Sequence, residues 1–123
     1  MTISGDFPHI TNRRITSNGI ELNIAEQGDA DAPLIVMLHG FPESWFSWRH
    51  QFAPLAAAGY HVVAPDMRGY GESDKPSDIS AYNQVEVVND VKGLVAALGY
   101  ETAVVIGHDW GGPTAWSLSL IHI

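Results

Sequence analysis

Three short apolar runs alternate with two segments of helical periodicity, and this alternation limits the possible folds more than any other feature of the sequence. The apolar runs are residues 34–38, 60–64 and 102–106. The segments with apolar residues at steps of three and four are residues 44–58 and 83–98. Continuous apolar runs are typical of strands covered on both faces, and Asn83 with Glu86 has the spacing of a capping box. Strand, helix, strand, helix, strand predicts the α/β class, with a mostly parallel sheet and flanking helices.

A hairpin is predicted before these segments. Residues 13–17 and 20–27 flank Asn18-Gly19, a pair that tolerates the positive φ angles of a tight turn between antiparallel strands. The 123 residues suffice for one domain at most, and 46% hydrophobic against 16% charged residues predicts a buried core rather than disorder.

Charge and cysteine content narrow the range of partners and compartments. The formal charge of −8 disfavours nonspecific binding to nucleic acid or to an anionic membrane, so small molecules are the expected partners. The chain has no cysteine, and we find neither a leader segment nor a run long enough to span a bilayer. We therefore expect a cytoplasmic protein; its oligomeric state cannot be read from the sequence.

Residues 107–111, Gly-His-Asp-Trp-Gly, have the pattern of a nucleophile elbow between a predicted strand and a predicted helix. Glycines suit such a turn because side chains at those positions would collide with neighbouring backbone. The central residue is Asp109, whose carboxylate is ionised at neutral pH and needs no base before it attacks a carbon. Its natural target is an electrophilic sp³ carbon, as in an epoxide or an alkyl halide. The simpler interpretation, a helix-capping aspartate, does not account for both glycines.

The segment His39-Gly40-Phe41-Pro42 follows another predicted strand and is expected to complete an oxyanion hole. The backbone N–H groups of Phe41 and Trp110 would converge on the carbonyl oxygen of an Asp109 ester, where negative charge develops as hydroxide adds. His39 and His108 are expected to be noncatalytic.

Three motifs each follow a predicted strand. They are residues 39–49 (HGFPESWFSWR), 66–76 (DMRGYGESDKP) and 107–112 (GHDWGG). Together, and in this order, they resemble the α/β-hydrolase superfamily, most closely its epoxide hydrolase branch. The resemblance covers residues from about 7 to 116 and implies the N-terminal portion of an α/β-hydrolase fold, truncated after the nucleophile elbow.

The resemblance implies an enzyme that opens small epoxides to vicinal diols without a cofactor or a metal. Asp109 would form an alkyl ester, tyrosines of a cap domain would protonate the epoxide oxygen, and a histidine paired with a carboxylate would activate water. No Asp or Glu follows Asp109 in the sequence, and the only later histidine is His122. We expect His122 to be too near the elbow in sequence to act as the base, and the chain alone not to turn over.

Two alternatives stay open. A haloalkane or haloacetate dehalogenase would use the same aspartate nucleophile; the indole N–H of Trp110 suits a halide, whereas Phe41-Pro42-Glu43 disfavours the haloalkane branch and Trp110 disfavours the haloacetate one. A noncatalytic binding protein of the same fold is the other alternative, which the intact elbow disfavours.

The last six residues do not continue the pattern of the family. Residues 118–123, Leu-Ser-Leu-Ile-His-Ile, correspond to the codons ctg tct ctt ata cac atc of the transposon end used in tagmentation libraries. We therefore divide the chain into residues 1–117, the N-terminal part of the hydrolase core domain, and residues 118–123, an expected adapter-derived tail that is not native.

Overall fold

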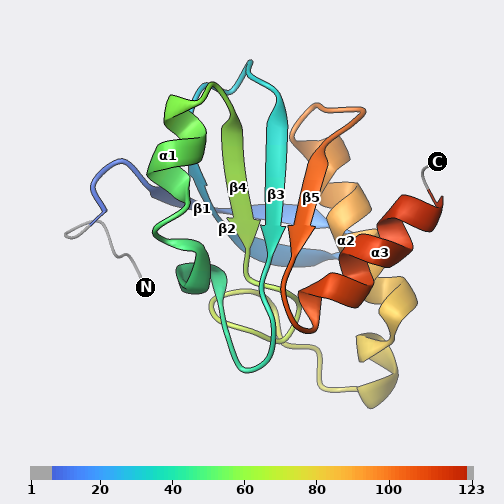
Figure 1. Cartoon of the computed structure of the whole chain (residues 1–123). Helices are drawn as coiled ribbons and strands as arrows, with labels where there is room; N and C mark the ends of the chain where they lie inside the picture. The colour runs from blue at the N-terminus through green and yellow to red at the C-terminus, as the bar shows by residue number, and fades with distance from the viewer. Residues whose placement is uncertain (1–6, 122–123) are drawn as a thin grey trace.

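The structure is a computed structural model that describes residues 7–121. Three strands come first, and helical segments and strands then alternate along this part of the chain (Figure 1). The strands are β1 (Thr11–Ser17), β2 (Ile20–Gln27), β3 (Leu34–Leu38), β4 (His61–Pro65) and β5 (Val104–Gly107). The helices are the 3-10 segments η1 (Trp45–Trp48) and η2 (Ile79–Tyr82), and α1 (Phe52–Ala57), α2 (Gln84–Ala97) and α3 (Gly111–Ile121).

The strands form one sheet in the order β1-β2-β4-β3-β5. β3 pairs in parallel with β4 and β5, whereas β2 pairs antiparallel with β1 and β4. The predicted α/β class is thus confirmed, and the sheet of the described residues is mixed. The predicted hairpin is also present, because Asn18 and Gly19 take φ angles of 52° and 78° at the turn between β1 and β2.

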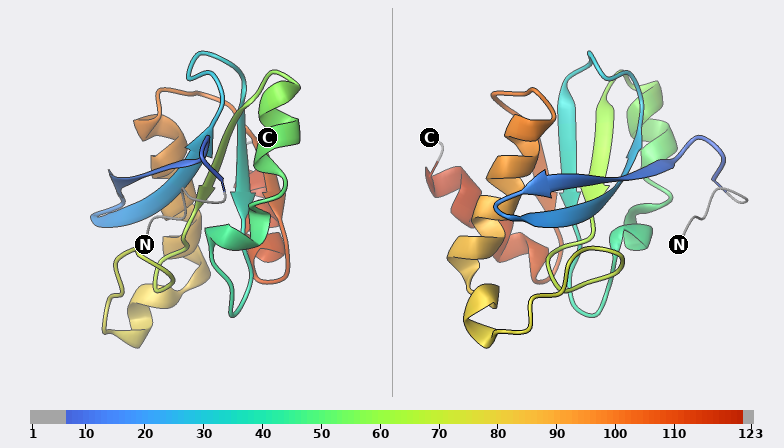
Figure 2. Two further views of the ribbon diagram at one scale, coloured as in Figure 1. Left: turned by 90° about the vertical axis from the view of Figure 1, so that its left-hand side faces the viewer. Right: turned by 180° about the vertical axis from the view of Figure 1, so that it is seen from behind.

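Helices cover both faces of the sheet, with α1 and α2 on opposite sides (Figure 2). Alternate residues of a strand point to opposite faces, so Leu34, Val36 and Leu38 of β3 pack with α2 and α3. Ile35 and Met37 pack on the other side with η1 and α1. All of β3 is buried, and this double coverage explains its unbroken apolar sequence.

The single helix predicted over residues 44–58 is wrong, because the segment divides into η1 and α1. Ser44 caps η1, its side chain accepting the N–H of Phe46 at 3.3 Å. Pro54 has no N–H and its ring clashes with the preceding turn, so it is tolerated only near a helix start, and α1 begins at Phe52. Trp45 and Phe52 are nevertheless both buried, as the periodicity predicts.

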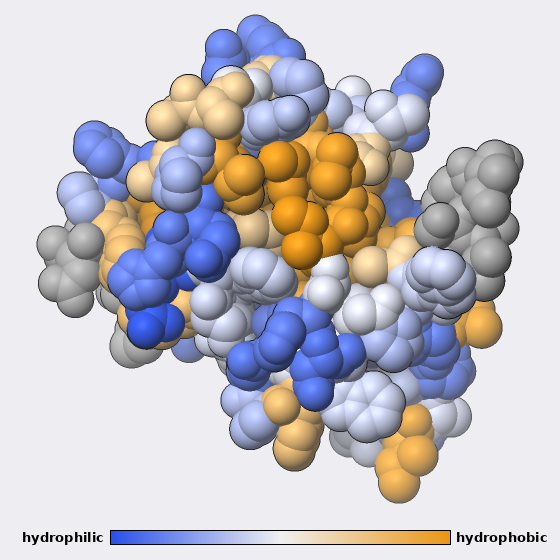
Figure 3. Space-filling model, viewed as in Figure 1, coloured by the Kyte–Doolittle hydropathy of each residue, from blue (hydrophilic) through white to orange (hydrophobic). Residues whose placement is uncertain are grey.

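β5 lies at the edge of the sheet and is only partly covered, although its apolar run predicts a strand buried on both faces. Val105 packs against the α2 side of the core. On the opposite face Val104 is 54% and Ile106 is 37% exposed. In the part of the chain that the structure describes, no helix lies over this face, and a hydrophobic area is visible over β3 and β5 beside α1 (Figure 3).

The loop after β4 is built around the buried carboxylate of Asp66. Asp66 accepts the N–H groups of Trp45 at 2.9 Å and of Glu72 at 3.0 Å, and the side-chain amide of Asn23 at 3.0 Å. A Cβ on Gly71 would lie 2.2 Å from Asp66 Oδ2, so only glycine fits there. The loop is therefore held by defined hydrogen bonds.

A buried ion pair joins this loop to α2. The guanidinium of Arg68 donates to Asp90 through Nε at 2.7 Å and through Nη2 at 2.8 Å, and both side chains are nearly inaccessible. The hydrogen bond to Asp90 raises the pKa of Arg68. At the start of α2, the Asn83 side chain accepts the N–H of Glu86 at 3.0 Å, which confirms the predicted cap.

α3 continues into the segment that we expect to be foreign to the native protein. The helix extends to Ile121, and Leu118 is buried in the core on the α2 side. His122 and Ile123 lie outside the described residues.

Candidate active site

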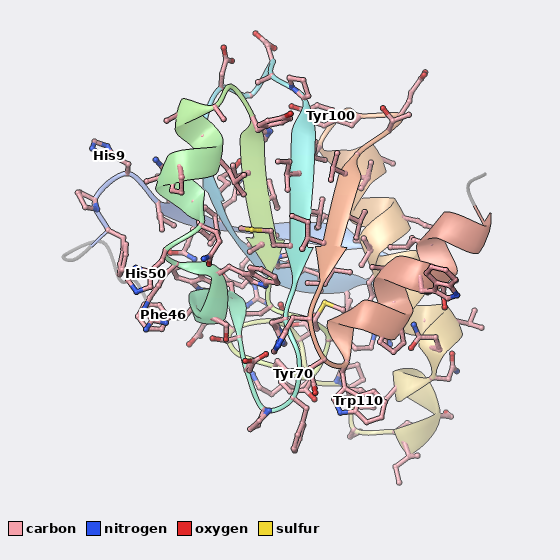
Figure 4. The ribbon with its side chains drawn as sticks, in the orientation of Figure 1. His9, Phe46, His50, Tyr70, Tyr100 and Trp110 are labelled. Atoms are coloured by element: carbon pink, nitrogen blue, oxygen red, sulfur yellow. The ribbon has the colours of Figure 1, made fainter. Side chains whose placement is uncertain are left out.

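Three loops gather at the carboxyl ends of the parallel strands β3, β4 and β5 (Figure 1). They are residues 39–44, 66–78 and 108–110, and each of the three sequence motifs falls within or overlaps one of them. Tyr70 and Trp110 mark this end of the sheet, whereas Tyr100 lies at the other end (Figure 4). The carboxyl ends of strands are where ligands bind in open α/β sheets, so this is the candidate active site.

Asp109 occupies a tight turn between β5 and α3. Its φ angle is 57°, a left-handed conformation that is uncommon outside glycine. A Cβ on Gly107 would lie 2.2 Å from the carbonyl oxygen of Gly111, and a Cβ on Gly111 would lie 2.3 Å from that of Leu38. Both positions therefore admit only glycine, and the turn has the crowded geometry that the glycine pattern predicts.

The loop after β3 brings a backbone donor to Asp109. The N–H of Phe41 donates to Asp109 Oδ2 at 3.1 Å, across 68 residues of sequence. The N–H groups of Phe41 and then of Trp110 hold the pKa of the Asp109 carboxyl below its ordinary value. The Phe41–Pro42 peptide bond is cis. The structure thus brings together all three residues that the sequence selects for the site.

The aromatic side chains beside Asp109 are open to solvent. Phe41 is 61% and Trp110 is 66% exposed. Trp110 lines a hollow of about 360 Å³, together with Tyr70, Gln84 and Thr114 among others. Burial and the nearby charge of Asp109 raise the pKa of Tyr70.

A larger hollow, of about 700 Å³, lies between α2, α3 and β5. It is lined mainly by apolar side chains, with Tyr100 and Glu101 at the end of β5 remote from Asp109. None of the residues that line it belongs to the three sequence motifs. Although this hollow is the larger of the two, it is therefore not the candidate active site.

His39 supports the loops and is not free to act as a base. Its Nε2 accepts the N–H of Met67 at 2.9 Å, so its Nδ1 carries the proton and donates to the carbonyl of Gly40 at 2.9 Å. Burial lowers the pKa of His39, which keeps the ring neutral. His108 is exposed, with Nδ1 3.5 Å from Glu43 Oε1.

Glu43 is the site residue that sequence reasoning missed. Its carboxylate accepts the N–H of Gly40 at 2.8 Å and faces His108. The available signal was its position three residues after Gly40, a spacing at which a side chain often bonds back to the backbone of a loop.

Within residues 7–121, no three His, Cys, Asp or Glu side chains are grouped as metal ligands would be. In the same part of the chain, no helix has the length and hydrophobicity that crossing a bilayer requires.

Fold and site geometry agree with the sequence comparisons. Residues 33–122 match the alpha/beta hydrolase fold family. The chain belongs to this family.

Several epoxide hydrolases are among the proteins to which this chain is similar. Epoxide hydrolase A of Mycobacterium tuberculosis is 47% identical over 112 residues, which are 91% of this chain and 35% of the relative. The AB hydrolase superfamily protein YfhM of Bacillus subtilis is 51% identical over 105 residues, covering 85% of this chain and 37% of that protein. Over the matched region, the chain is therefore homologous to epoxide hydrolases.

Solved structures give the same result. The crystal structure of an epoxide hydrolase from Vigna radiata superposes with a TM-score of 0.90 at 42% identity, covering 94% of this chain and 36% of that one. Epoxide hydrolase A from Mycobacterium thermoresistibile also gives a TM-score of 0.90, at 45% identity, covering 92% of this chain and 35% of that one. The chain thus spans about a third of the length of the relatives it matches.

Proposed function

We propose that this chain forms the nucleophile-bearing part of an epoxide hydrolase, with Asp109 as the nucleophile. The observation that supports this most directly is the exposed carboxylate at a left-handed turn, which accepts the backbone N–H of Phe41 at 3.1 Å. Its lowered pKa keeps the carboxylate charged, which an attacking group needs. Homology to epoxide hydrolases favours the epoxide as the substrate.

In the first step, a carboxylate oxygen of Asp109 attacks one epoxide carbon and the bond from this carbon to the ring oxygen breaks. The electron pair goes to the ring oxygen, which takes a proton from an acid that the remainder of a longer protein would supply. The product is a hydroxyalkyl ester of Asp109.

In the second step, hydroxide adds to the ester carbonyl, and negative charge develops on its oxygen. The N–H groups of Phe41 and Trp110 lie where they can donate to that oxygen, and one such donor contributes about 3 kcal/mol to lowering a barrier of this kind. Collapse of the tetrahedral intermediate releases the diol and restores the carboxylate. His39 is not the base that deprotonates this water, because both of its ring nitrogens are occupied.

Covalent labelling of the 123-residue chain tests this proposal. Incubation with styrene oxide, followed by intact-mass and peptide mass spectrometry, should show one adduct of the mass of the epoxide on Asp109. Asp109→Asn should not be labelled at this position. Labelling of Asp109 without sustained diol release would support both Asp109 as the nucleophile and the expectation that this chain alone does not turn over. Absence of the adduct would contradict the role of Asp109. Sustained diol release would contradict the expectation that the chain does not turn over.

Haloalkane dehalogenation is the second candidate, because the exposed indole of Trp110 adjoins Asp109. It predicts an ester of Asp109 formed from an alkyl bromide, with release of bromide, at a rate above that of the epoxide reaction. If neither reagent labels Asp109, a noncatalytic binding role is favoured.

A further inference from the structure

The peptide unit between Gly40 and Phe41 is fixed from both sides. Its carbonyl oxygen accepts the N–H of Glu43 at 2.9 Å and Nδ1 of His39 at 2.9 Å. Its N–H, which points the opposite way in a trans peptide, donates to Asp109. The orientation of this one peptide plane therefore decides whether Asp109 receives the hydrogen bond of Phe41.

Glu43 also holds the preceding peptide. Glu43 Oε1 accepts the N–H of Gly40 at 2.8 Å, while the backbone N–H of Glu43 donates to Gly40. These two reciprocal bonds satisfy both backbone polar groups of Gly40. Rotation of the Gly40–Phe41 plane would break at least one of them.

The same carboxylate reaches the elbow. Glu43 Oε1 lies 3.5 Å from Nδ1 of His108, the residue before Asp109, and the Glu43 side chain is 30% exposed. One side chain therefore contacts both loops whose alignment the site requires, and no step of the proposed reaction uses it.

We propose that Glu43 is a positioning residue that holds Gly40 through its carboxylate and its backbone N–H, so that the N–H of the following Gly40–Phe41 peptide points at Asp109. Glu43 acts through this peptide and does not touch the reacting atoms. The catalytic consequence of this positioning rests on the proposed function. The hydrogen bonds themselves do not depend on a substrate.

Nuclear magnetic resonance of the isotope-labelled 123-residue chain tests this inference without a substrate. The two signals are the amide resonance of Phe41 and the pH titration of the Asp109 carboxyl carbon. In Glu43→Ala, the Phe41 amide proton should move upfield as its hydrogen bond is lost, and the Asp109 midpoint should rise. In Glu43→Gln both signals should stay close to those of the unchanged chain, because the amide oxygen can still accept the N–H of Gly40. Glu101→Ala, at an exposed position beyond the site, is the matched control.

Three results would overturn the inference. One is a Phe41 amide that does not respond to Asp109→Ala, which removes the acceptor oxygen, since the hydrogen bond would then be absent from the unchanged chain as well. Another is a Glu43→Ala chain in which the Gly40 amide moves but the Phe41 and Asp109 signals do not. If Glu43→Ala does not fold, Glu43→Asp retains the charge with a shorter reach, and unchanged Phe41 and Asp109 signals there would also refute the inference. A chain that behaves as expected here but never forms an ester would contradict the proposed function alone.

Discussion

Gly40 and Asp109 approach so closely that no side chain fits between them. A Cβ on Gly40 would lie 2.4 Å from the Cβ of Asp109 and 2.7 Å from its Oδ2. These two residues belong to loops that follow different strands, and their contact sets the distance between the loop after β3 and the elbow after β5. The glycine at position 40 is therefore required by the elbow and not by its own backbone conformation.

We predict that Gly40→Ala slows the labelling of Asp109 by styrene oxide about 100-fold, because a displacement of about 1 Å at a reacting group has an effect of this size. The rate of adduct formation, followed by intact mass, checks this. Gly112→Ala is the control, since nothing lies within 4 Å of a Cβ there. Equal rates for both variants would contradict the prediction.

We predict that the Asp109 carboxyl titrates at a lower pH in the folded chain than in the chain unfolded by urea. The N–H groups of Phe41 and Trp110 favour its charged form, so its folded pKa is depressed. The corresponding stability is present above the unfolded-state pKa and is lost as the pH falls through the folded one. Carbon-detected titration measures both midpoints, and a folded midpoint at or above the unfolded one would refute the prediction.

We predict that Arg68→Met lowers the free energy of unfolding by about 3 to 5 kcal/mol, because it leaves the buried charge of Asp90 without its partner. If the free energy of unfolding of the unchanged chain is smaller than this loss, Arg68→Met will show no cooperative unfolding in urea. Arg13→Met is the control. Arg13 pairs with Glu26 but its side chain is 52% exposed, so its loss should cost less than about 1 kcal/mol. Similar losses in the two variants would show that the Arg68 pair contributes no more than a surface pair.

We predict that the 123-residue chain self-associates at high concentration through β5. This edge strand has no charged residue, and Val104 and Ile106 are exposed on it. Val104→Lys should reduce the apparent mass in sedimentation experiments, because a lysine on an edge opposes strand pairing. Glu101→Lys, outside the strand, changes the net charge by two units instead of one and should still have less effect.

Local signals in the sequence predicted the parts of the fold that depend on neighbouring residues. Asn18-Gly19 indicated the hairpin and Asn83 the start of α2, because each acts on backbone a few residues away. The division of residues 44–58 was also encoded locally, by Pro54, but the apolar periodicity concealed it.

Features set by distant contacts could not be read in this way. An apolar run does not show whether its strand is central or at an edge, so the exposure of Val104 was missed. The elbow was recognised from the sequence because glycine is required at positions where a Cβ would collide with neighbouring backbone. The contacts of Glu43 with Gly40 and His108 depend on how the loop after β3 packs against the elbow. The only sign of them in the sequence is the spacing of three residues between Gly40 and Glu43.

Every group shown to act on the Asp109 side chain precedes Gly112 in the chain. Proteins are synthesised from the N-terminus, so a ribosome making a longer relative would release this whole corner from its exit tunnel before most of the polypeptide exists. The Asp109 carboxylate and its amide donor would then be assembled early, and the later segments would be added around a turn already in place.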